Sequence, residues 1–209
     1  PPLLADFIAY HLFGDMSEYS FAKSINVLEP SAGDGVFFDA LFNNQFFKKR
    51  FKKLPRISLT AVEYDSAAYN ILKDRTQSYN SASSTIEYVN SDYLKFQQDN
   101  QQKFDLIIGN PPYIKSGTLT KEQVDICESI HKASNLSSKK IKNIWTSFLV
   151  SGVQSLSSEG VLCFVLPAEL LQVIYAKEIR DYLKNEFEKI EIFTFNANNL
   201  LIKNNNKPK

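Results

Sequence analysis

The sequence predicts an α/β fold in which a mostly parallel, twisted sheet has helices on both faces. Short strand-like runs alternate with helical patterns along the chain, which is typical of this class. Two of the runs, around Leu106 and from Val161 to Leu166, are apolar without polar alternation, as expected of strands covered on both faces. The chain has 209 residues, 44% of them hydrophobic, which suffices for one such domain with a full core.

The chain begins with a predicted helix, strand and helix. Leu3 to Phe13 is apolar at helical spacing, and Ile25 to Glu29 is a compact apolar run that ends in a turn of small residues. The helix after that turn is predicted from aromatic and aliphatic residues at i, i+4 spacing, namely Phe37, Phe38, Leu41 and Phe42.

Two more strands and a helix are predicted next. The run Ile57 to Glu63 leads into a helix that begins near Asp65, a residue type suited to an N-cap. A third strand spans roughly Thr85 to Asn90, and the fourth is the buried run Phe104 to Gly109. The polar stretch from Lys115 to Asn143 gives no clear pattern.

The last third of the chain repeats the alternation. Trp145, Phe148, Leu149, Val153 and Leu156 form one face of a predicted helix. Gly160 precedes the fifth strand, a helix is expected from Ala168 to about Asn185, and a sixth strand from Lys189 to Phe195. We therefore expect residues 1–195 to form one domain with six strands, followed by an Asn- and Lys-rich tail at 196–209.

Composition excludes several classes of protein. With only Cys127 and Cys163, a disulfide framework is not expected, and a reduced, cytoplasmic setting is favoured. The longest apolar stretch is interrupted by Pro167 and Glu169, so a membrane span is not expected. His11 and His131 have no partners at metal-ligand spacing, so no metal site is expected. A formal net charge of +1 lacks the basic excess of a chain that grips a polyanion unaided.

The first candidate loop follows the first strand, with the sequence Glu29-Pro30-Ser31-Ala32-Gly33-Asp34-Gly35. In an open parallel sheet, ligands bind at the carboxyl ends of the strands. Small residues let the backbone approach a ligand, and the next helix directs its amide-rich N-terminus toward it. A dinucleotide-binding loop would have a third glycine where Phe38 stands, which weakens that interpretation. An ordinary strand-to-helix turn is the alternative.

Two acidic residues follow later strands. Glu63 ends the second strand and is a candidate for gripping a ribose hydroxyl pair, with a solvated strand-end acid as the alternative. Asp92, in Asn90-Ser91-Asp92-Tyr93, is a candidate acceptor for an adenine amino group, and Tyr93 a candidate for stacking on the ring. Taken alone, Asp92 is better explained as a helix cap.

The strongest single signal is Asn110-Pro111-Pro112-Tyr113 after the buried fourth strand. Two prolines remove two backbone donors and fix φ, so the loop presents carbonyl oxygens. A planar amine can then donate its two N–H groups to the Asn110 side-chain oxygen and the Pro111 carbonyl while Tyr113 stacks on its ring. The exocyclic amine of adenine is a poor nucleophile because its lone pair is delocalised, and two such acceptors would localise that pair and stabilise the developing positive charge.

With these motifs, the chain resembles the N6-adenine DNA methyltransferases, most closely the catalytic domains of restriction–modification enzymes of the type IIG, Eco57I-like kind. The resemblance covers Pro1 to about Phe195 and implies a Rossmann-like fold that binds S-adenosyl-L-methionine. It assigns cofactor contacts to two sets of residues. They are Glu29, Pro30, Ser31, Gly33 and Gly35 from the first loop, and Glu63, Tyr64, Asp92, Tyr93, Asn110 and Pro112 from the others.

The resemblance also implies a catalytic role for Asn110-Pro111-Pro112-Tyr113 and a late aromatic that stacks on a flipped base, for which Phe195 is the candidate. The opening motif lacks the Thr that usually precedes it. Double-stranded DNA would be held mainly by a recognition domain, of which residues 196–209 would be a remnant, and an endonuclease could be fused or separate.

Other functions share the catalytic loop. Enzymes that methylate a glutamine amide in release factors, or guanine N2 in RNA, use a similar loop, although the long polar insertion and the opening helix favour DNA. A non-enzymatic scaffold is a further alternative, and no carboxylate–lysine cluster supports a nuclease. The basic cluster Lys48–Lys53 is expected to be a solvated helix end. Lys139, Lys140 and Lys142 are better placed for DNA-backbone contact, at the catalytic edge.

Overall fold

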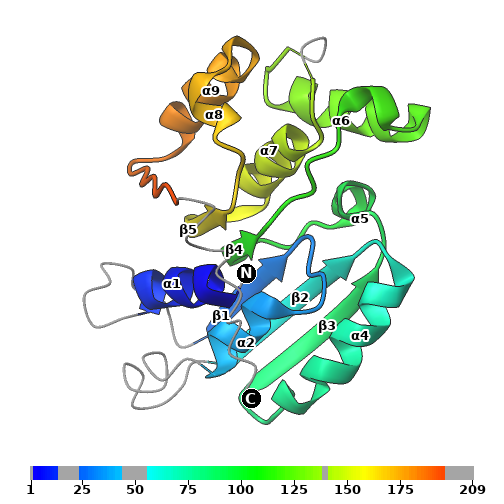
Figure 1. The fold of residues 1–209 in the computed structure, drawn as a ribbon, viewed down its shortest axis with the longest axis vertical. Helices are drawn as coiled ribbons and strands as arrows, with labels where there is room; N and C mark the ends of the chain where they lie inside the picture. Colours follow the sequence, from blue (N-terminus) through cyan, green and yellow to red (C-terminus); the bar gives the residue numbers. More distant parts are fainter. Residues whose placement is uncertain (1, 14–23, 44–55, 138–140, 196–209) are drawn as a thin grey trace, which may run out of the picture.

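A five-stranded, all-parallel sheet organises the protein, with the strand order β3-β2-β1-β4-β5 (Figure 1). The computed structural model describes residues 2–13, 24–43, 56–137 and 141–195. The strands are β1 (Ser24–Glu29), β2 (Arg56–Glu63), β3 (Ser84–Asn90), β4 (Phe104–Gly109) and β5 (Leu156–Phe164). Strand order reverses at β1, which pairs with β2 on one side and with β4 on the other.

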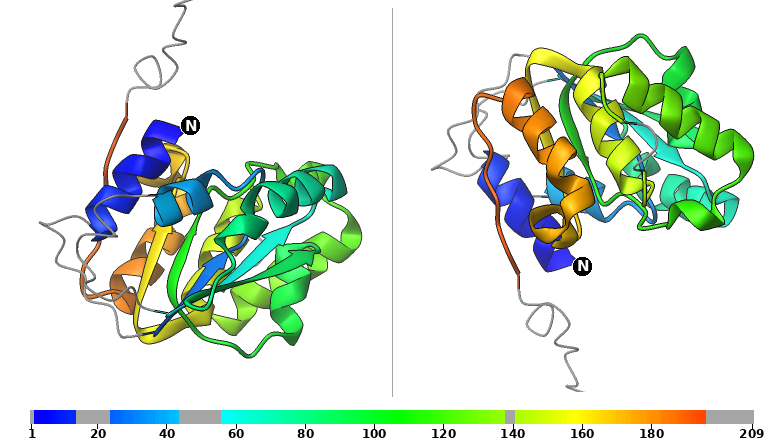
Figure 2. Two further views of the ribbon diagram at one scale, coloured as in Figure 1. Left: turned by 90° about the horizontal axis from the view of Figure 1, so that it is seen from below. Right: turned by 90° about the horizontal axis from the view of Figure 1, so that it is seen from above.

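Helices cover both faces of this sheet (Figure 2). One face packs against α1 (Pro2–Phe13), α2 (Val36–Asn43) and α4 (Ser66–Thr76). The other packs against α5 (Tyr93–Asp99), α6 (Lys121–Ala133), α7 (Trp145–Ser155) and α9 (Lys177–Glu186). The expected Rossmann-like architecture is confirmed. In the part of the chain that the structure describes, no helix is both long and apolar enough to cross a bilayer.

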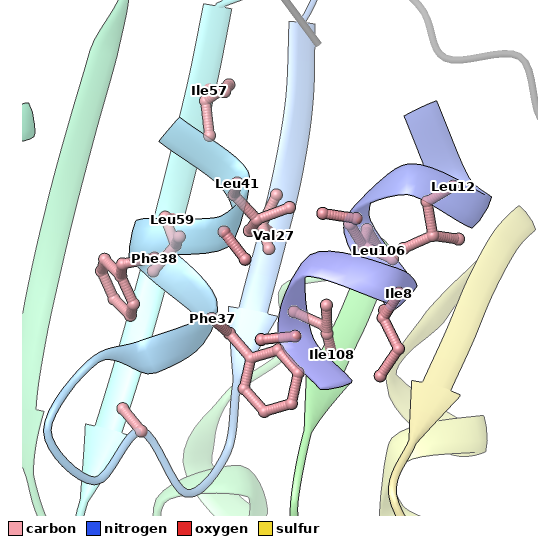
Figure 3. Packing of buried hydrophobic residues seen from close by; sticks show 14 of the residues in the cluster. Ile8, Leu12, Val27, Phe37, Phe38, Leu41, Ile57, Leu59, Leu106 and Ile108 are labelled. Carbon is pink, nitrogen blue, oxygen red and sulfur yellow. The ribbon is translucent and has the colours of Figure 1, made fainter. Parts of the chain in front are cut away.

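Alternation along the strands divides the core into two clusters. Val27, Leu106 and Ile108 face α1 and α2, whereas Leu28 and Ile107 face the opposite layer. The first cluster packs Ile8 and Leu12 of α1 and Phe37, Phe38 and Leu41 of α2 onto these strands (Figure 3). β4 is buried on both faces, which explains its apolar run from Leu106 to Ile108. β5, the other run without polar alternation, lies at the edge of the sheet and is only half-buried, so the expectation that both of its faces are covered is wrong.

The first four predicted strands are confirmed to within a residue, and Asp65 caps α4 by accepting a hydrogen bond from the Ala68 N–H at 2.8 Å. The fifth strand begins earlier than expected, at Leu156, and its register with β4 shifts between Phe104 and Leu106. Gly160 therefore lies inside the strand, where a Cβ would meet the Ser157 carbonyl oxygen at 3.0 Å.

Two expectations for the last segment are wrong. The helix expected from Ala168 to Asn185 is broken into α8 (Glu169–Gln172), a 3₁₀ turn (Ile174–Ala176) and α9. The backbone is extended at Val173, and the Arg180 guanidinium donates to the carbonyls of Leu170 and Val173, which satisfies the interrupted end.

The sixth strand, expected at Lys189 to Phe195, is absent from the described structure. This segment runs past α1 (Figure 2) and is held by side chains, since Phe193 and Phe195 each pack edge-on against Phe7 with ring centroids 5.2 Å apart. A strand needs a neighbouring strand with which its backbone can form hydrogen bonds. In this segment, ring packing and the contact between His11 and Glu191 hold the chain in place instead. The tail 196–209 and the basic cluster at 48–53 lie outside the described residues, as do Lys139 and Lys140.

Candidate functional site

The predicted site residues follow the carboxyl ends of four neighbouring strands. The loops after β1, β2, β3 and β4 all emerge at the same edge of the parallel sheet. The reversal of strand order at β1 puts the β1 and β4 loops side by side, and a cleft at such a point is where open α/β sheets bind ligands. The Ser31 hydroxyl donates to the Asn110 carbonyl oxygen at 3.0 Å, which ties the two loops together.

The loop after β1 depends on glycine at two positions. Gly33 and Gly35 adopt φ values of +56° and +85°, which L-residues with a side chain rarely adopt. A Cβ on Gly35 would lie 2.9 Å from Leu72 and from Thr76 of α4, whereas a Cβ on Gly33 would meet nothing within 4 Å. Gly35 is therefore required by packing, and Gly33 leaves an open surface beside the loop.

Arg75 of α4 holds this loop in place through hydrogen bonds, and the sequence did not predict this role. Its guanidinium donates to the carbonyl oxygen of Asp34 at 2.6 Å, to the Asp34 carboxylate at 2.8 Å and to the Asp39 carboxylate at 2.5 Å. Tyr79 donates to the other oxygen of Asp39 at 2.8 Å. These contacts join α4 to the loop and to the first turn of α2.

Glu29 is the most unusual residue of the site. Its side chain is buried, with 1% exposure, and neither carboxylate oxygen has a hydrogen-bond partner in the described structure. Burial raises the pKa of this carboxyl well above its usual value, and the nearby Glu63 and Asp34 raise it further. A buried acid without a partner is costly unless a ligand supplies donors or a positive charge.

Glu63, at the end of β2, is held in place by two backbone donors. Its Oε2 accepts from the Gly33 N–H and its Oε1 from the Asp65 N–H, both at 2.8 Å. Each carboxylate oxygen has capacity for a second donor. The Asn90 side chain donates to the carbonyl oxygens of Glu63 and Tyr64, so the ends of β2 and β3 are fixed relative to each other. The Tyr64 ring is exposed.

Asp92 is the N-cap of α5, as its alternative interpretation proposed. Its Oδ1 accepts from the Leu94 N–H at 2.9 Å, and its Oδ2 accepts from the Gln123 side chain at 3.1 Å. The neighbouring Tyr93 corrects one expectation. Its ring is 2% exposed and packs on Phe148 in the core, so it does not offer a face for stacking on a ligand. Burial raises the pKa of its hydroxyl to about 12.

The loop after β4 is anchored at both ends. The Gly109 carbonyl oxygen accepts from the Val165 N–H, and the Ile114 carbonyl oxygen from the Ile144 N–H, each at 2.9 Å. A Cβ on Gly109 would approach Pro30 to 3.2 Å, so glycine permits the close approach of the β1 and β4 loops. Pro111 is buried and Pro112 is half-buried.

Asn110 and Tyr113 meet within this loop. The Tyr113 hydroxyl lies 2.8 Å from the Asn110 Oδ1 and 3.0 Å from the Val165 carbonyl oxygen, and donates its proton to one of them at a time. Partial burial raises the pKa of Tyr113, so the hydroxyl stays a donor. The ring is 47% exposed and keeps a free surface. The structure thus brings together an amide oxygen that accepts hydrogen bonds and an accessible aromatic.

Phe195 does not follow the carboxyl end of any of these four strands. Its ring packs on Phe7 of α1 and is 42% exposed. The hydrogen bonds and ring contacts that the structure gives it do not join it to Asn110 or Tyr113.

Sequence reasoning also missed Gln123, although the pattern Thr120-x-x-Gln123 ahead of apolar residues at helical spacing is that of a helix start.

Comparisons with known proteins agree on one group. The sequence profile described as "Eco57I restriction-modification methylase" matches residues 15–200. Modification methylase CviBIII of Paramecium bursaria Chlorella virus NC1A is 26% identical over 170 residues, which cover 81% of this chain and 38% of that protein. Type II methyltransferase M.AccI of Acinetobacter calcoaceticus is 27% identical over 172 residues, which cover 79% of this chain and 29% of that protein. The chain therefore spans about a third of the length of these relatives.

Among solved structures, the fold is similar to that of the type I restriction-modification system methyltransferase subunit from Streptococcus thermophilus. The TM-score is 0.58 at 19% sequence identity, and the likeness covers 88% of this chain and 37% of that one. At this identity the likeness supports the fold and says nothing of the substrate.

Proposed function

Because the chain belongs to the Eco57I restriction-modification methylase family, we propose that it transfers a methyl group from S-adenosyl-L-methionine to the N6 amino group of an adenine in DNA. The observation that supports this most is the Asn110 side-chain oxygen, which lies beside the exposed Tyr113 in a loop that Ser31 ties to the loop containing Glu29. We propose further that this is the modification activity of a restriction–modification system acting in the cytoplasm.

The residues of the β1 loop fit the cofactor that the family and fold imply. S-adenosyl-L-methionine carries an ammonium group and a sulfonium, and in the described structure Glu29 is a buried carboxyl group whose oxygens have no hydrogen-bond partner. A bound cation would favour the ionised form of this carboxyl. Glu63 is held rigidly by two N–H groups and retains acceptor capacity for ribose hydroxyls. Gly33 leaves space where a side chain would stand. Asp92 and the Tyr93 backbone would face the adenine.

When bound, the cofactor supplies an electrophilic methyl group on sulfur. In the proposal, the Asn110 Oδ1 and the Pro111 carbonyl each accept one N–H of the target amine. They draw its lone pair out of the ring plane and stabilise the positive charge on nitrogen as it attacks. Preorganised acceptors of this kind are typically worth about 10²–10³ in rate each. Tyr113 offers its exposed face to the base, and its hydroxyl can move to the Val165 carbonyl when the amine takes Oδ1.

DNA is the proposed substrate on the strength of the relatives, whose names are those of modification and type II enzymes. The target base has to leave the helix to reach such a loop, which costs about a few kcal/mol. A formal net charge of +1 supports the proposal that a recognition module outside these residues supplies most phosphate contacts. The relatives' greater length leaves room for such a module.

The test is to incubate the full-length protein with methyl-labelled cofactor and, separately, with DNA, RNA and a protein release factor. The expected product is labelled N6-methyladenine in the nucleoside digest of the DNA. Label in cytosine, in RNA guanine or in a glutamine of the release factor would overturn the proposal, because each requires a different amine in the loop.

A further inference from the structure

The polar segment after the catalytic loop contains a helix whose start is fixed by a reciprocal pair of hydrogen bonds. Thr120 is the N-cap of α6, and its hydroxyl accepts from the Gln123 N–H at 3.2 Å. In return, the Gln123 Oε1 accepts from the Thr120 N–H at 3.1 Å. Because the oxygen end of the Gln123 amide accepts from Thr120, its nitrogen end is left to donate to another group.

That nitrogen reaches the candidate adenine acceptor. Gln123 Nε2 donates to Asp92 Oδ2 at 3.1 Å, while Asp92 Oδ1 accepts from the Leu94 N–H at 2.9 Å. The carboxylate is therefore held at both oxygens by donors from two different helices, α5 and α6. With both oxygens held, the carboxylate cannot rotate freely, and Oδ2 keeps capacity for one more donor.

An exposed ion pair also joins α5 and α6. Lys95 of α5 and Glu122 of α6 form an ion pair at 2.8 Å, with side chains 60% and 66% exposed. Exposed pairs like this are screened by solvent and stabilise little. The half-buried contact between Gln123 and Asp92 is the one suited to fixing a carboxylate in a defined direction.

Resting on the proposed function, we propose that Gln123 is a positioning residue that fixes Asp92 Oδ2 as the acceptor for the amino group of the cofactor's adenine. A rigid acceptor favours a purine with an amino group and disfavours one with a carbonyl oxygen at the same position, because two acceptors would then face each other. Gln123 thereby determines how much more tightly the site binds an adenosyl cofactor than an inosyl one.

Two variants separate this role from the stability of α6. Gln123→Glu keeps an oxygen for the Thr120 N–H and so keeps the helix start, but it replaces the donor that faces Asp92 with an acceptor. Thr120→Ala removes the hydroxyl half of the same pair and leaves the contact of Gln123 with Asp92 in place. Each variant is made in the full-length protein, and its Tm is recorded.

The readout is the affinity for S-adenosyl-L-homocysteine and for its deaminated analogue, S-inosyl-L-homocysteine, by calorimetry. The wild type should prefer the amino form by about 10- to 100-fold, as expected for one hydrogen bond to a charged group. Gln123→Glu should lose most of that preference and raise the cofactor KM, with kcat at saturating cofactor nearly unchanged. Thr120→Ala should lower the Tm while keeping the preference.

Three results would count against the proposal. Gln123→Glu with wild-type discrimination overturns the role of Gln123, and so does Thr120→Ala with an equal loss of discrimination, since helix stability would then explain both. A wild-type protein that binds neither compound would refute the proposed function itself, which distinguishes the two failures.

Discussion

Replacing Gly35 with alanine perturbs the β1 loop where its backbone is most constrained. The residue has φ +85°, and a Cβ there would lie 2.9 Å from side-chain carbons of Leu72 and Thr76. The left-handed conformation costs an alanine about 1–2 kcal/mol, and overpacking a buried contact about 1–3 kcal/mol. A gain of about 0.4–1 kcal/mol from a stiffer unfolded chain offsets part of this. We expect the free energy of unfolding to fall by about 2–4 kcal/mol.

Gly33 is the matched control in the same loop. Its φ of +56° carries the same backbone cost, but its Cβ would meet nothing within 4 Å. The free energy of unfolding should fall by only about 0.5–1.5 kcal/mol. In the proposed site, however, the added methyl group points into the space for the cofactor, so cofactor affinity should fall more than tenfold.

Urea unfolding without cofactor and calorimetry with S-adenosyl-L-homocysteine measure the two effects separately. Gly35→Ala should lose mainly stability, and Gly33→Ala mainly cofactor affinity. Equal destabilisation by the two substitutions would refute the packing argument. Wild-type cofactor affinity in Gly33→Ala would refute the assignment of the open surface to the ligand.

Substitutions at three further residues test the site. Glu29→Gln should weaken cofactor binding at least tenfold, and without cofactor the stability of the wild type relative to this variant should fall as pH rises above 4.5. The reason is that the unfolded chain releases this proton there while the folded chain, whose pKa is raised, retains it; a pH-independent difference in urea unfolding would contradict this. Arg75→Ala should weaken cofactor binding severalfold but cost at most about 1 kcal/mol of unfolding free energy, since its ion pairs are partly exposed; unchanged calorimetric affinity would remove Arg75 from the account. In methylation assays, Tyr113→Phe should stay within about tenfold of wild type and Tyr113→Ala lose about 10- to 100-fold, as expected for loss of base stacking; equal losses would assign the role to the hydroxyl.

The sequence predicted most of the sheet because its strands are specified locally. Compact apolar runs identified β1 and β4, and the residues after them identified the two principal loops, since parallel strands put their carboxyl ends at one edge. Asp65 and Asp92 were recognised as residues that cap helices, and both do so. These features depend on a few consecutive residues.

The features that sequence reasoning missed depend on partners far along the chain. The Arg75 brace needs Asp34 and Asp39, about 40 residues earlier, which no local pattern reveals. Tyr93 was expected to face a ligand, but packing against Phe148 turns its ring into the core. Lys189 to Phe195 alternates like a strand, yet a strand exists only where a neighbour accepts its hydrogen bonds, and ring packing on Phe7 replaces that pairing.

The helix α6 is a different case, because its signals are local. Thr120 and Gln123 have the spacing of a reciprocal helix cap, and Ile126, Cys127 and Ile130 follow at helical spacing. Because most residues of this segment are polar, the apolar residues that form one face of the helix were not recognised as an amphipathic pattern. Nothing local indicates that Gln123 also reaches Asp92, 31 residues earlier, so that contact required the fold.

In the proposed reaction, Asn110 serves the target amine and not the cofactor. Asn110→Ala should lower the rate of methyl transfer to DNA by about 10²–10³ while the calorimetric affinity for cofactor stays within about threefold of wild type. Asn100→Ala, at the C-cap residue of α5 and ahead of the first residue of β4, serves as the control and should change neither. A tenfold or greater loss of cofactor affinity in Asn110→Ala, or methyl transfer at the wild-type rate, would contradict the account.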